Sequence, residues 1–182
     1  MEIGTAAPYG KAPDKDHPSA LLLQRADAEP VRWLRVGSYT LGVIPYEADE
    51  IYVYRNEQGN LGYLCVVSKF DSNGRETFVQ KNVWQLNCPR GFARMVMRYL
   101  SSDGRILASD ERQRAKGAIM WKSFLKENCN DRHVYLQTAV SISEILPHTR
   151  EMMIAFAYAG NSDTKVFAVS DQPIKGRIRS KW

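Results

Sequence analysis

Hydrophobic and polar residues alternate along much of the chain between residues 31 and 86, which is the pattern of half-buried β-strands. Turn-forming residues interrupt this alternation at Gly37, at Gly59 and at the pair Asn73 and Gly74. The pattern therefore predicts strands at residues 31–36, 39–44, 51–55, 61–70 and 76–86. The last three of these strands are joined by two tight turns, so we expect them to form an antiparallel meander.

The spacing of the apolar residues changes after residue 90. In residues 90–100 they recur every three or four positions, which predicts a helix with one buried face. A short strand at 105–109 then leads to a second helix, which begins after Asp110 and ends near residue 128. The remaining sequence predicts a strand at 133–136, a helical turn at 142–146, and a terminal β-hairpin with strands at 152–158 and 164–170.

Together these elements predict an α+β fold with a central mixed, mainly antiparallel sheet, two helices and a terminal β-hairpin. Residues 1–30 are rich in proline and predict an irregular lead-in with one short helix near residues 21–26. Residues 31–172 form a single predicted domain, which suits a chain of 182 residues, and residues 173–182 form a basic tail. The terminal hairpin pairs either within the chain or with a second copy in a homodimer.

Composition narrows the class of protein without identifying it. Hydrophobic residues make up 44% of the chain and charged residues 25%, as in ordinary globular proteins. No apolar run approaches the roughly 20 residues that span a bilayer, and the first residues lack the pattern of a secretory signal. The three cysteines and three histidines are widely scattered, which indicates neither a disulfide framework nor a metal site. The sequence therefore predicts a cytoplasmic protein with no metal and no membrane partner.

The net charge of +5 owes much to the C-terminal tail. Lys175, Arg177, Arg179 and Lys181 alternate there with other residues. One interpretation is a solvated, frayed tail, and the other is a surface that contacts a nucleic-acid backbone or an acidic protein.

The segment 84–94 joins the meander to the first predicted helix and has small residues at Gly91 and Ala93. Small residues let a backbone approach a phosphate group, and a helix N-terminus presents N–H groups and the positive end of its dipole. Arg90 and Arg94 lie one helical turn apart and would add charge-assisted contacts to phosphate. The alternative is an ordinary strand-to-helix turn in which Pro89 starts the helix.

This segment resembles the cofactor-binding turn of the GNAT superfamily, the acyl-CoA-dependent N-acyltransferases. In that family a strand leads into a helix through a Gln/Arg-x-x-Gly-x-Gly/Ala turn, whose backbone amides hold the pyrophosphate of coenzyme A. The order of elements from residue 51 to the final strand, about two-thirds of the chain, resembles the family too, although Cys88 stands where the family has Gln or Arg. The resemblance implies an acetyl-CoA site formed by Leu86, Cys88, Arg90, Gly91, Phe92, Ala93 and Arg94.

A second point of resemblance lies at residues 109–121. In GNAT enzymes this strand end and helix carry a polar residue near the pantetheine, for which Ser109 is the candidate, and a tyrosine that protonates the departing thiolate. Trp121 occupies the tyrosine position by spacing, and an indole N–H cannot act as a general acid near neutral pH. Trp121 either lines the acyl-CoA cleft or anchors the core. The stretch is similar to divergent GNAT-like proteins of phages and plasmids.

Acidic residues and one thiol supply the remaining candidates for chemistry. Glu47, Asp49 and Glu50 cluster before the meander, near where such folds place amine substrates. They would attract a cationic amine or act as a base, or they form an ordinary solvated loop. Cys88 beside the helix start is either a thiol with a lowered pKa or an ordinary one, and no histidine nearby in the sequence favours a nucleophile.

The resemblance implies an N-acetyltransferase that moves an acyl group from acetyl-CoA to an amine by direct attack. The alternative is a GNAT-like binding module without catalysis, which engages nucleic acid or a host protein. Its contact surface would combine the basic tail with Arg90, Arg94 and Arg98, which recur at four-residue steps on one helical face. The sequence does not identify the amine.

Overall fold

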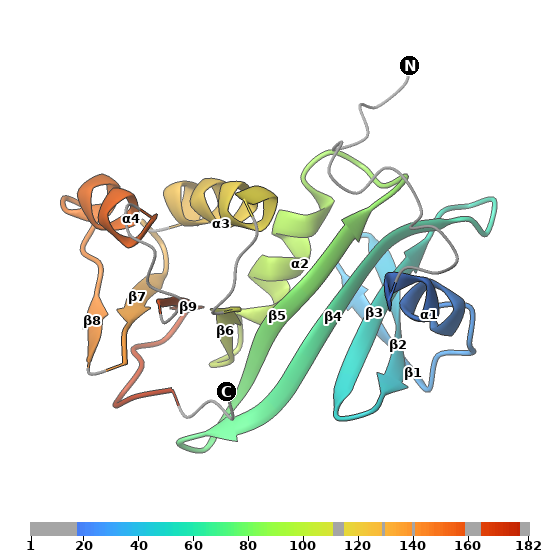
Figure 1. Cartoon of the computed structure of the whole chain (residues 1–182), viewed down its shortest axis with the longest axis horizontal. Helices are drawn as coiled ribbons and strands as arrows, with labels where there is room; N and C mark the ends of the chain where they lie inside the picture. The colour runs from blue at the N-terminus through green and yellow to red at the C-terminus, as the bar shows by residue number, and fades with distance from the viewer. Residues whose placement is uncertain (1–17, 111–114, 129, 140, 159–164, 179–182) are drawn as a thin grey trace. The chain divides into compact units, whose positions relative to one another are not determined.

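The computed structural model describes residues 18–110, 115–128, 130–139, 141–158 and 165–178. These residues form an α+β fold with one nine-stranded, mixed, mostly antiparallel sheet and four helices (Figure 1). The strands follow the order β1-β2-β3-β4-β5-β6-β9-β7-β8 across the sheet. The helices are α1 (Pro18–Arg25), α2 (Phe92–Leu100), α3 (Ala115–Asn128) and α4 (Arg150–Tyr158). The strands are β1 (Arg32–Val36), β2 (Tyr39–Tyr46), β3 (Asp49–Arg55), β4 (Leu61–Ser72), β5 (Arg75–Gln85), β6 (Ile106–Ser109), β7 (His133–Gln137), β8 (Ile142–Glu144) and β9 (Val166–Ser170).

The chain divides into two compact units that share the two long strands β4 and β5. Unit 1 comprises Met1–Lys69 and Gln80–Tyr99, and unit 2 comprises Phe70–Val79 and Leu100–Trp182.

The predicted meander of β3, β4 and β5 is confirmed in its strand order, because these strands are successive neighbours and β3 pairs antiparallel with β4. In unit 1, β2 and β1 continue the antiparallel pairing on the other side of β3. Strand alternation gives this part of the sheet two apolar faces. One face packs against α1 (Figure 1) through a cluster of buried residues, namely Leu22, Ala26, Ile44, Ile51, Val53, Leu64 and Val66. The opposite face carries Val43, Tyr52 and Cys65, which lie directly opposite one another on three adjacent strands.

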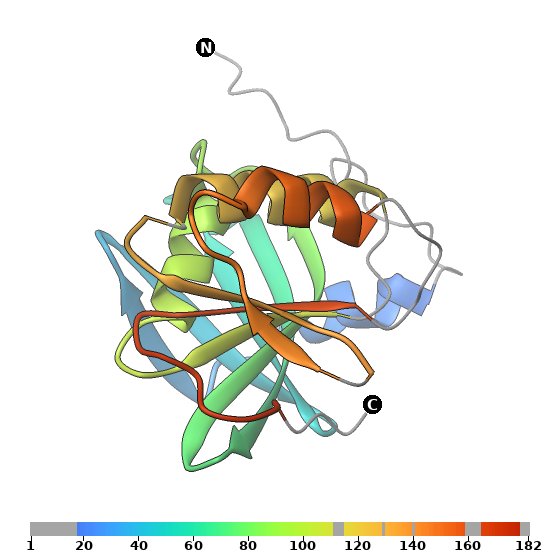
Figure 2. The same ribbon diagram turned by 90° about the vertical axis from the view of Figure 1, so that its left-hand side faces the viewer.

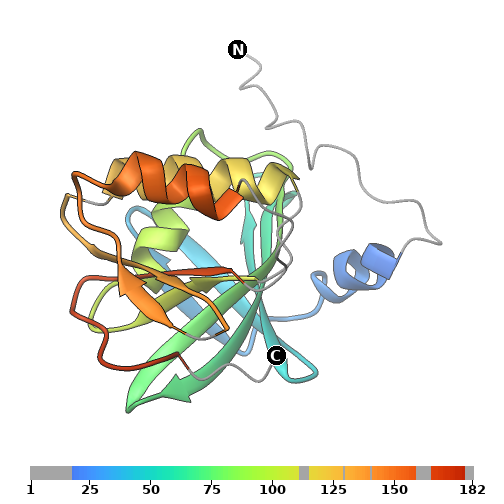
Figure 3. The same ribbon diagram turned by 60° about the vertical axis from the view of Figure 1, so that its left-hand side comes forward.

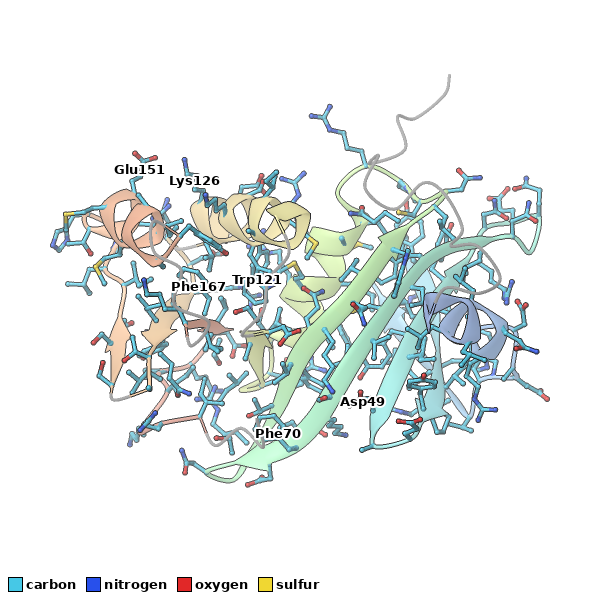
Figure 4. The ribbon with its side chains drawn as sticks, in the orientation of Figure 1. Asp49, Phe70, Trp121, Lys126, Glu151 and Phe167 are labelled. Carbon is cyan, nitrogen blue, oxygen red and sulfur yellow. The ribbon has the colours of Figure 1, made fainter. Side chains whose placement is uncertain are left out.

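In unit 2 the strands β6, β9, β7 and β8 are antiparallel neighbours. Their core includes Ile106, Tyr135 and Ala168. Helices α3 and α4 lie side by side (Figures 2 and 3), and an ion pair of 3.5 Å between Lys126 and Glu151 joins them (Figure 4). Arg150 of α4 also donates a hydrogen bond to the Lys126 carbonyl of α3 at 2.7 Å, so the two helices meet through polar contacts at the surface.

The C-terminal segment 171–178 is an ordered part of unit 2, so the interpretation of a frayed tail is wrong for these residues. Ile174 and Ile178 are buried with the core of the unit. The amide side chain of Gln137 accepts a hydrogen bond from the Ile178 N–H at 2.8 Å and donates one to the Ile178 carbonyl at 3.2 Å. Arg177 donates to the carbonyls of Thr138 and Ala139. Arg179 and Lys181 lie outside the described residues.

Two predictions for the C-terminal half are wrong. Residues 152–158, predicted as a strand, belong to helix α4, and residues 142–146, predicted as a helical turn, contain strand β8. The predicted terminal hairpin therefore does not form from these segments, and β9 pairs instead with β6 and β7. The segment Met152–Ile154 is continuously apolar, and such a short run does not distinguish a buried strand from a helix. The predicted hairpin turn at 159–163 and the first turn of the second helix at 111–114 lie outside the described residues.

Candidate functional site

The segment that leaves β5 and opens α2 is a type II turn. The Phe92 N–H donates to the Pro89 carbonyl at 3.1 Å, and Gly91, at the third position of this turn, has φ +84°. The Met95 N–H then donates to the Gly91 carbonyl at 3.0 Å, which is the first hydrogen bond of the helix. Only glycine adopts this φ without strain, so the turn itself requires Gly91.

A close backbone contact fixes the residues before the turn. The carbonyl of Gly62 in β4 accepts hydrogen bonds from the N–H groups of both Leu86 and Asn87, at 2.9 and 3.1 Å. A Cβ atom on residue 62 would lie 2.5 Å from the Asn87 carbonyl oxygen, so glycine is required at this position as well. The backbone at Leu86 is therefore held against the meander before the chain reaches the turn.

Phe92 anchors the start of α2 in an aromatic cluster. Its ring lies 4.7–5.2 Å, centroid to centroid, from the rings of Tyr39, Tyr54 and Tyr63. The side chains of Phe92 and Ala93 are buried. These two predicted cofactor-binding residues are therefore packing groups, and at this site a ligand would meet them through their backbones alone.

The cationic residues of the site differ in their surroundings. Arg90 is exposed at the second position of the turn. Arg94 is partly buried, and its Nη2 atom lies 3.6 Å from the point that a Cβ on residue 91 would occupy. Arg98, one further turn along the helix, is exposed. Positive charge thus accompanies the N–H groups at the start of α2, and an anion is the ligand type that such a start favours.

Cys88 lies between β5 and the turn and is half-buried. Its sulfur is 3.9 Å from Oε1 of Gln85. Burial raises the pKa of the Cys88 thiol to about 11. A nucleophilic cysteine needs a lowered pKa, so the thiol of Cys88 is not activated as a nucleophile.

The acidic candidates lie on and after the β2–β3 turn. Glu47 is exposed in that turn, with φ +54°. The Asp49 carboxylate accepts hydrogen bonds from Ser68 and from Lys81. Both oxygens of the Glu50 carboxylate accept hydrogen bonds from Arg32, at 2.7 and 2.8 Å. The carboxylate also accepts one from the Tyr52 hydroxyl at 2.8 Å.

Sequence reasoning missed the two partners of Glu50. Arg32 and Tyr52 lie on the same face of the sheet as Glu50, since Arg32 is opposite Val43 and Val43 is opposite Tyr52. Burial together with the charge of Glu50 raises the pKa of Tyr52 far above its ordinary value. These contacts could have been found by aligning the strands, because residues two apart on one strand, and residues directly opposite on neighbouring strands, lie on the same face of the sheet.

The same face holds two buried polar atoms that the sequence did not predict. Among the described residues, the Tyr63 hydroxyl and Oε1 of Gln80 are buried without a hydrogen-bond partner. Cys65 lies beside them, and its sulfur accepts a hydrogen bond from Nε2 of Gln80 at 3.6 Å. Burial raises the pKa of the Cys65 thiol to about 12, so this thiol is neutral at physiological pH.

The two remaining candidates belong to unit 2. The Ser109 side chain is fully buried, and its Oγ accepts a hydrogen bond from the Phe167 N–H at 3.0 Å. Trp121 (Figure 4) is 2% exposed. It makes an edge-to-face contact with Phe124, with ring centroids 5.9 Å apart. Of the two alternatives for Trp121, these contacts favour the core anchor.

Within the described ranges, no group of three histidine, cysteine or acidic side chains is arranged to hold a metal ion. No described helix is both long enough and apolar enough to cross a membrane.

Seven of the predicted cofactor-binding residues lie around one turn of unit 1, namely Leu86, Cys88, Arg90, Gly91, Phe92, Ala93 and Arg94, whereas Trp121 belongs to unit 2. Comparison with known proteins yields no matching family model, no matching curated protein and no matching solved structure.

Proposed function

We propose that this chain is a GNAT-type domain that binds acetyl-CoA at the turn before α2 and transfers the acyl group to an amine. The observation that carries the proposal is the type II turn at Pro89–Phe92, with Gly91 at φ +84° and α2 beginning directly after it. The pyrophosphate of coenzyme A would lie over this helix start, where N–H groups and the helix dipole favour negative charge. Arg90 would add a charge-assisted contact from the solvent side.

The order of elements supports the same assignment. The meander β3–β5 is followed by α2, β6, α3 and β7, which matches the order on which the resemblance to the GNAT superfamily rests up to β7, whereas the terminal hairpin that completed that order does not form. Strands β5 and β6 are neighbours in a mixed sheet and are connected through α2, as a strand–helix–strand crossover requires.

The proposed reaction is a direct attack of the amine nitrogen on the thioester carbon, which releases the thiol of coenzyme A. The protein's contribution would be positioning of the thioester and polarisation of its carbonyl by backbone N–H groups. Trp121 does not serve as the acid in this scheme, because its indole is buried and has no dissociable proton near neutral pH.

Binding without transfer is a second candidate function, and the burial of Trp121 favours it. Asp49 and Glu50 favour it too, since both carboxylates are already occupied by ion pairs with Lys81 and Arg32. In this case the turn would hold coenzyme A or another phosphate-bearing ligand and no acyl group would move.

Calorimetric titration with acetyl-CoA, coenzyme A and pantetheine tests the cofactor site. Pantetheine lacks the pyrophosphate, so we expect saturable binding of the first two ligands and much weaker binding of pantetheine. Arg90→Glu should weaken binding of acetyl-CoA by about tenfold or more, because it replaces an attractive charge with a repulsive one. Lys175→Glu makes the same change of charge on an exposed residue of unit 2 and serves as the control. Equal weakening by the two variants, or no binding of acetyl-CoA, would remove the proposed site.

Gly91→Glu is a less specific probe, because any side chain at φ +84° also strains the turn. Its thermal stability must be measured alongside its affinity. Detection of released thiol after addition of a panel of amines then separates the two candidate functions. Release that depends on both acetyl-CoA and an amine supports the transferase, and tight binding without release supports the binding module.

A further inference from the structure

Strand β1 forms one end of the nine-stranded order, and in the described part of the chain β2 is the strand that pairs with it. The outer edge of a terminal strand carries backbone groups that can pair with another strand. Natural sheets commonly cover such an edge or place charges and prolines along it. Pro30 precedes β1 and Arg32 and Arg35 lie within it, but this edge also bears two large exposed apolar side chains, Val31 just before the strand at 68% and Trp33 within it at 62% exposure.

The β1–β2 hairpin determines which backbone groups of β1 point outward. Gly37 has φ +61° at the first central position of the two-residue connection Gly37–Ser38, which is the signature of a type II′ turn. In such a hairpin the flanking residues Val36 and Tyr39 form a hydrogen-bonded pair. Hydrogen-bonded positions alternate along an antiparallel ladder, so Arg32, Leu34 and Val36 bond to β2. The N–H and C=O groups of Trp33 and Arg35 therefore face the outer edge.

The side chains of these same two residues share one face of the sheet. The ring of Trp33 lies over β2, with its Cζ3 atom 3.2 Å from the point that a Cβ on Gly42 would occupy. Arg35 is exposed two residues further along. The edge thus presents an aromatic ring and a guanidinium group in succession, and these two groups attract each other when stacked.

We propose that β1 pairs antiparallel with β1 of a second copy of this chain, about a two-fold axis that passes through Leu34. This axis places Trp33 opposite Arg35 of the second copy, and Arg35 opposite its Trp33. Both are positions whose backbone groups face outward, so the two pairs supply four N–H···O bonds without any change to the β1–β2 ladder. Leu34 lies opposite itself at the non-hydrogen-bonded position between them.

The strand's own sequence favours a second copy over an unrelated strand. In the antiparallel pair of identical strands, Trp33 of each copy lies opposite Arg35 of the other, and the two side chains can stack. No like charges lie directly opposite each other. A five-residue strand buries little surface, so we expect a weak dimer that dissociates on dilution.

Sedimentation equilibrium over a wide range of protein concentration tests the dimer, and two variants at one position test its register. Trp33→Arg places like charges opposite each other at Arg35 and should weaken the dimer by about tenfold or more. Trp33→Glu removes the same ring but places opposite charges there, so its dimer should stay within about threefold of the parent. Equal loss in both variants would contradict the Trp33–Arg35 pairing. A protein that stays monomeric at every concentration would overturn the proposal, even if it bound an extended peptide at this edge.

Cross-linking gives an independent test that does not depend on Trp33. Leu34→Cys places two thiols face to face at the two-fold axis, at a separation suited to a disulfide between strands. We expect mild oxidation to yield a covalent dimer. Gln58→Cys, exposed on the β3–β4 turn, is the control. Cross-linking of Leu34→Cys no faster than this control would place the axis elsewhere and overturn the proposed pairing.

Discussion

The Oγ atom of Ser109 accepts a hydrogen bond of 3.0 Å from the backbone N–H of Phe167. This contact comes where the ladder between β6 and β9 ends, since the last directly opposed residues are Ala108 and Ala168. The serine side chain thus takes the place of a backbone carbonyl at the end of the ladder. Its hydroxyl has a structural role in unit 2 that is independent of any role in catalysis.

Ser109→Ala should lower the free energy of unfolding by about 1–3 kcal/mol, because the buried Phe167 N–H would lose its acceptor. Chemical denaturation monitored by fluorescence provides the measurement. Ser38→Ala, at an exposed serine, should change stability by less than about 0.5 kcal/mol. If Ser109→Ala were as stable as this control, the hydrogen bond would have no net value.

Two glycines are expected to respond to alanine in opposite directions. Gly62→Ala should destabilise the protein, because its Cβ would lie 2.5 Å from the Asn87 carbonyl oxygen and would push the segment before the turn away from β4. Gly117→Ala in α3 should stabilise it by about 0.5–1 kcal/mol, since no atom lies within 4 Å of the added Cβ and alanine favours helix. Thermal melting of both variants checks the pair, and a shift of the same sign in both would contradict it.

The thiol of Cys88 should react slowly with alkylating reagents. With a pKa of about 11 in place of the ordinary 9.0, its thiolate fraction at pH 8 is lower by roughly a hundredfold. The rate should be measured at Cys88 in a Cys129→Ser background and compared with the rate in denaturant. A folded-state rate equal to the denatured rate would show that the thiol is not protected and would reopen a catalytic role.

The stability of the protein should fall as the pH rises from 9 to about 12. In the unfolded chain Cys65 ionises near its ordinary pKa of 9.0, whereas burial keeps the folded thiol protonated up to about 12. The unfolded state therefore releases a proton that the folded state retains, and alkali favours unfolding. Cys65→Ala should show a shallower decline over this window, and an identical decline in both proteins would indicate that other groups cause the effect.

Ile178→Ala should cost about 2–5 kcal/mol of stability, because this side chain is buried in the core of unit 2. Lys175→Ala, three residues earlier and exposed, should have little effect on unfolding. For the same reason a truncation that begins at Lys175 would not test the positive charge of the tail alone. A charge-reversing substitution at Lys175, which is exposed, separates charge from packing, whereas one at Arg177 would also remove its hydrogen bonds to Thr138 and Ala139.

The N-terminal half of the fold was predictable because its signals are local. Gly59, Asn73 and Gly74 interrupt the strand alternation, and all three have positive φ values in the turns that join β3, β4 and β5. The C-terminal half depends on distant pairing. Strand β9 lies between β6 and β7, and no local pattern distinguishes that arrangement from a hairpin with the apolar segment that forms α4.

The candidate site was predictable only in outline. Gly91 was singled out as a small residue that would let the backbone approach a phosphate, and the structure adds that the turn itself requires glycine at this φ. The phosphate contact predicted for Arg90 stays a prediction, and its side chain is exposed. The contacts of Glu50 with Arg32 required the register of three strands, which the sequence does not specify. The hydrogen bonds from Leu86 and Asn87 to the Gly62 carbonyl join residues more than twenty positions apart. A single glycine within a strand does not predict such a contact.

The position of Ile178 in the core of unit 2 has a consequence for biosynthesis. All of unit 1 has been translated once Tyr99 is made, whereas the core of unit 2 lacks a member until Ile178 follows. Arg75, near the tip of the β4–β5 hairpin, likewise lacks two of its acceptors, the hydroxyl of Ser170 and the carbonyl of Pro173, until those residues have been translated. At roughly 5–20 residues per second, a ribosome needs about 4–16 s for the 79 residues from Tyr99 to Ile178. During that interval the tip of the hairpin is an unsatisfied strand end on the nascent chain, where a chaperone or a neighbouring chain can reach it.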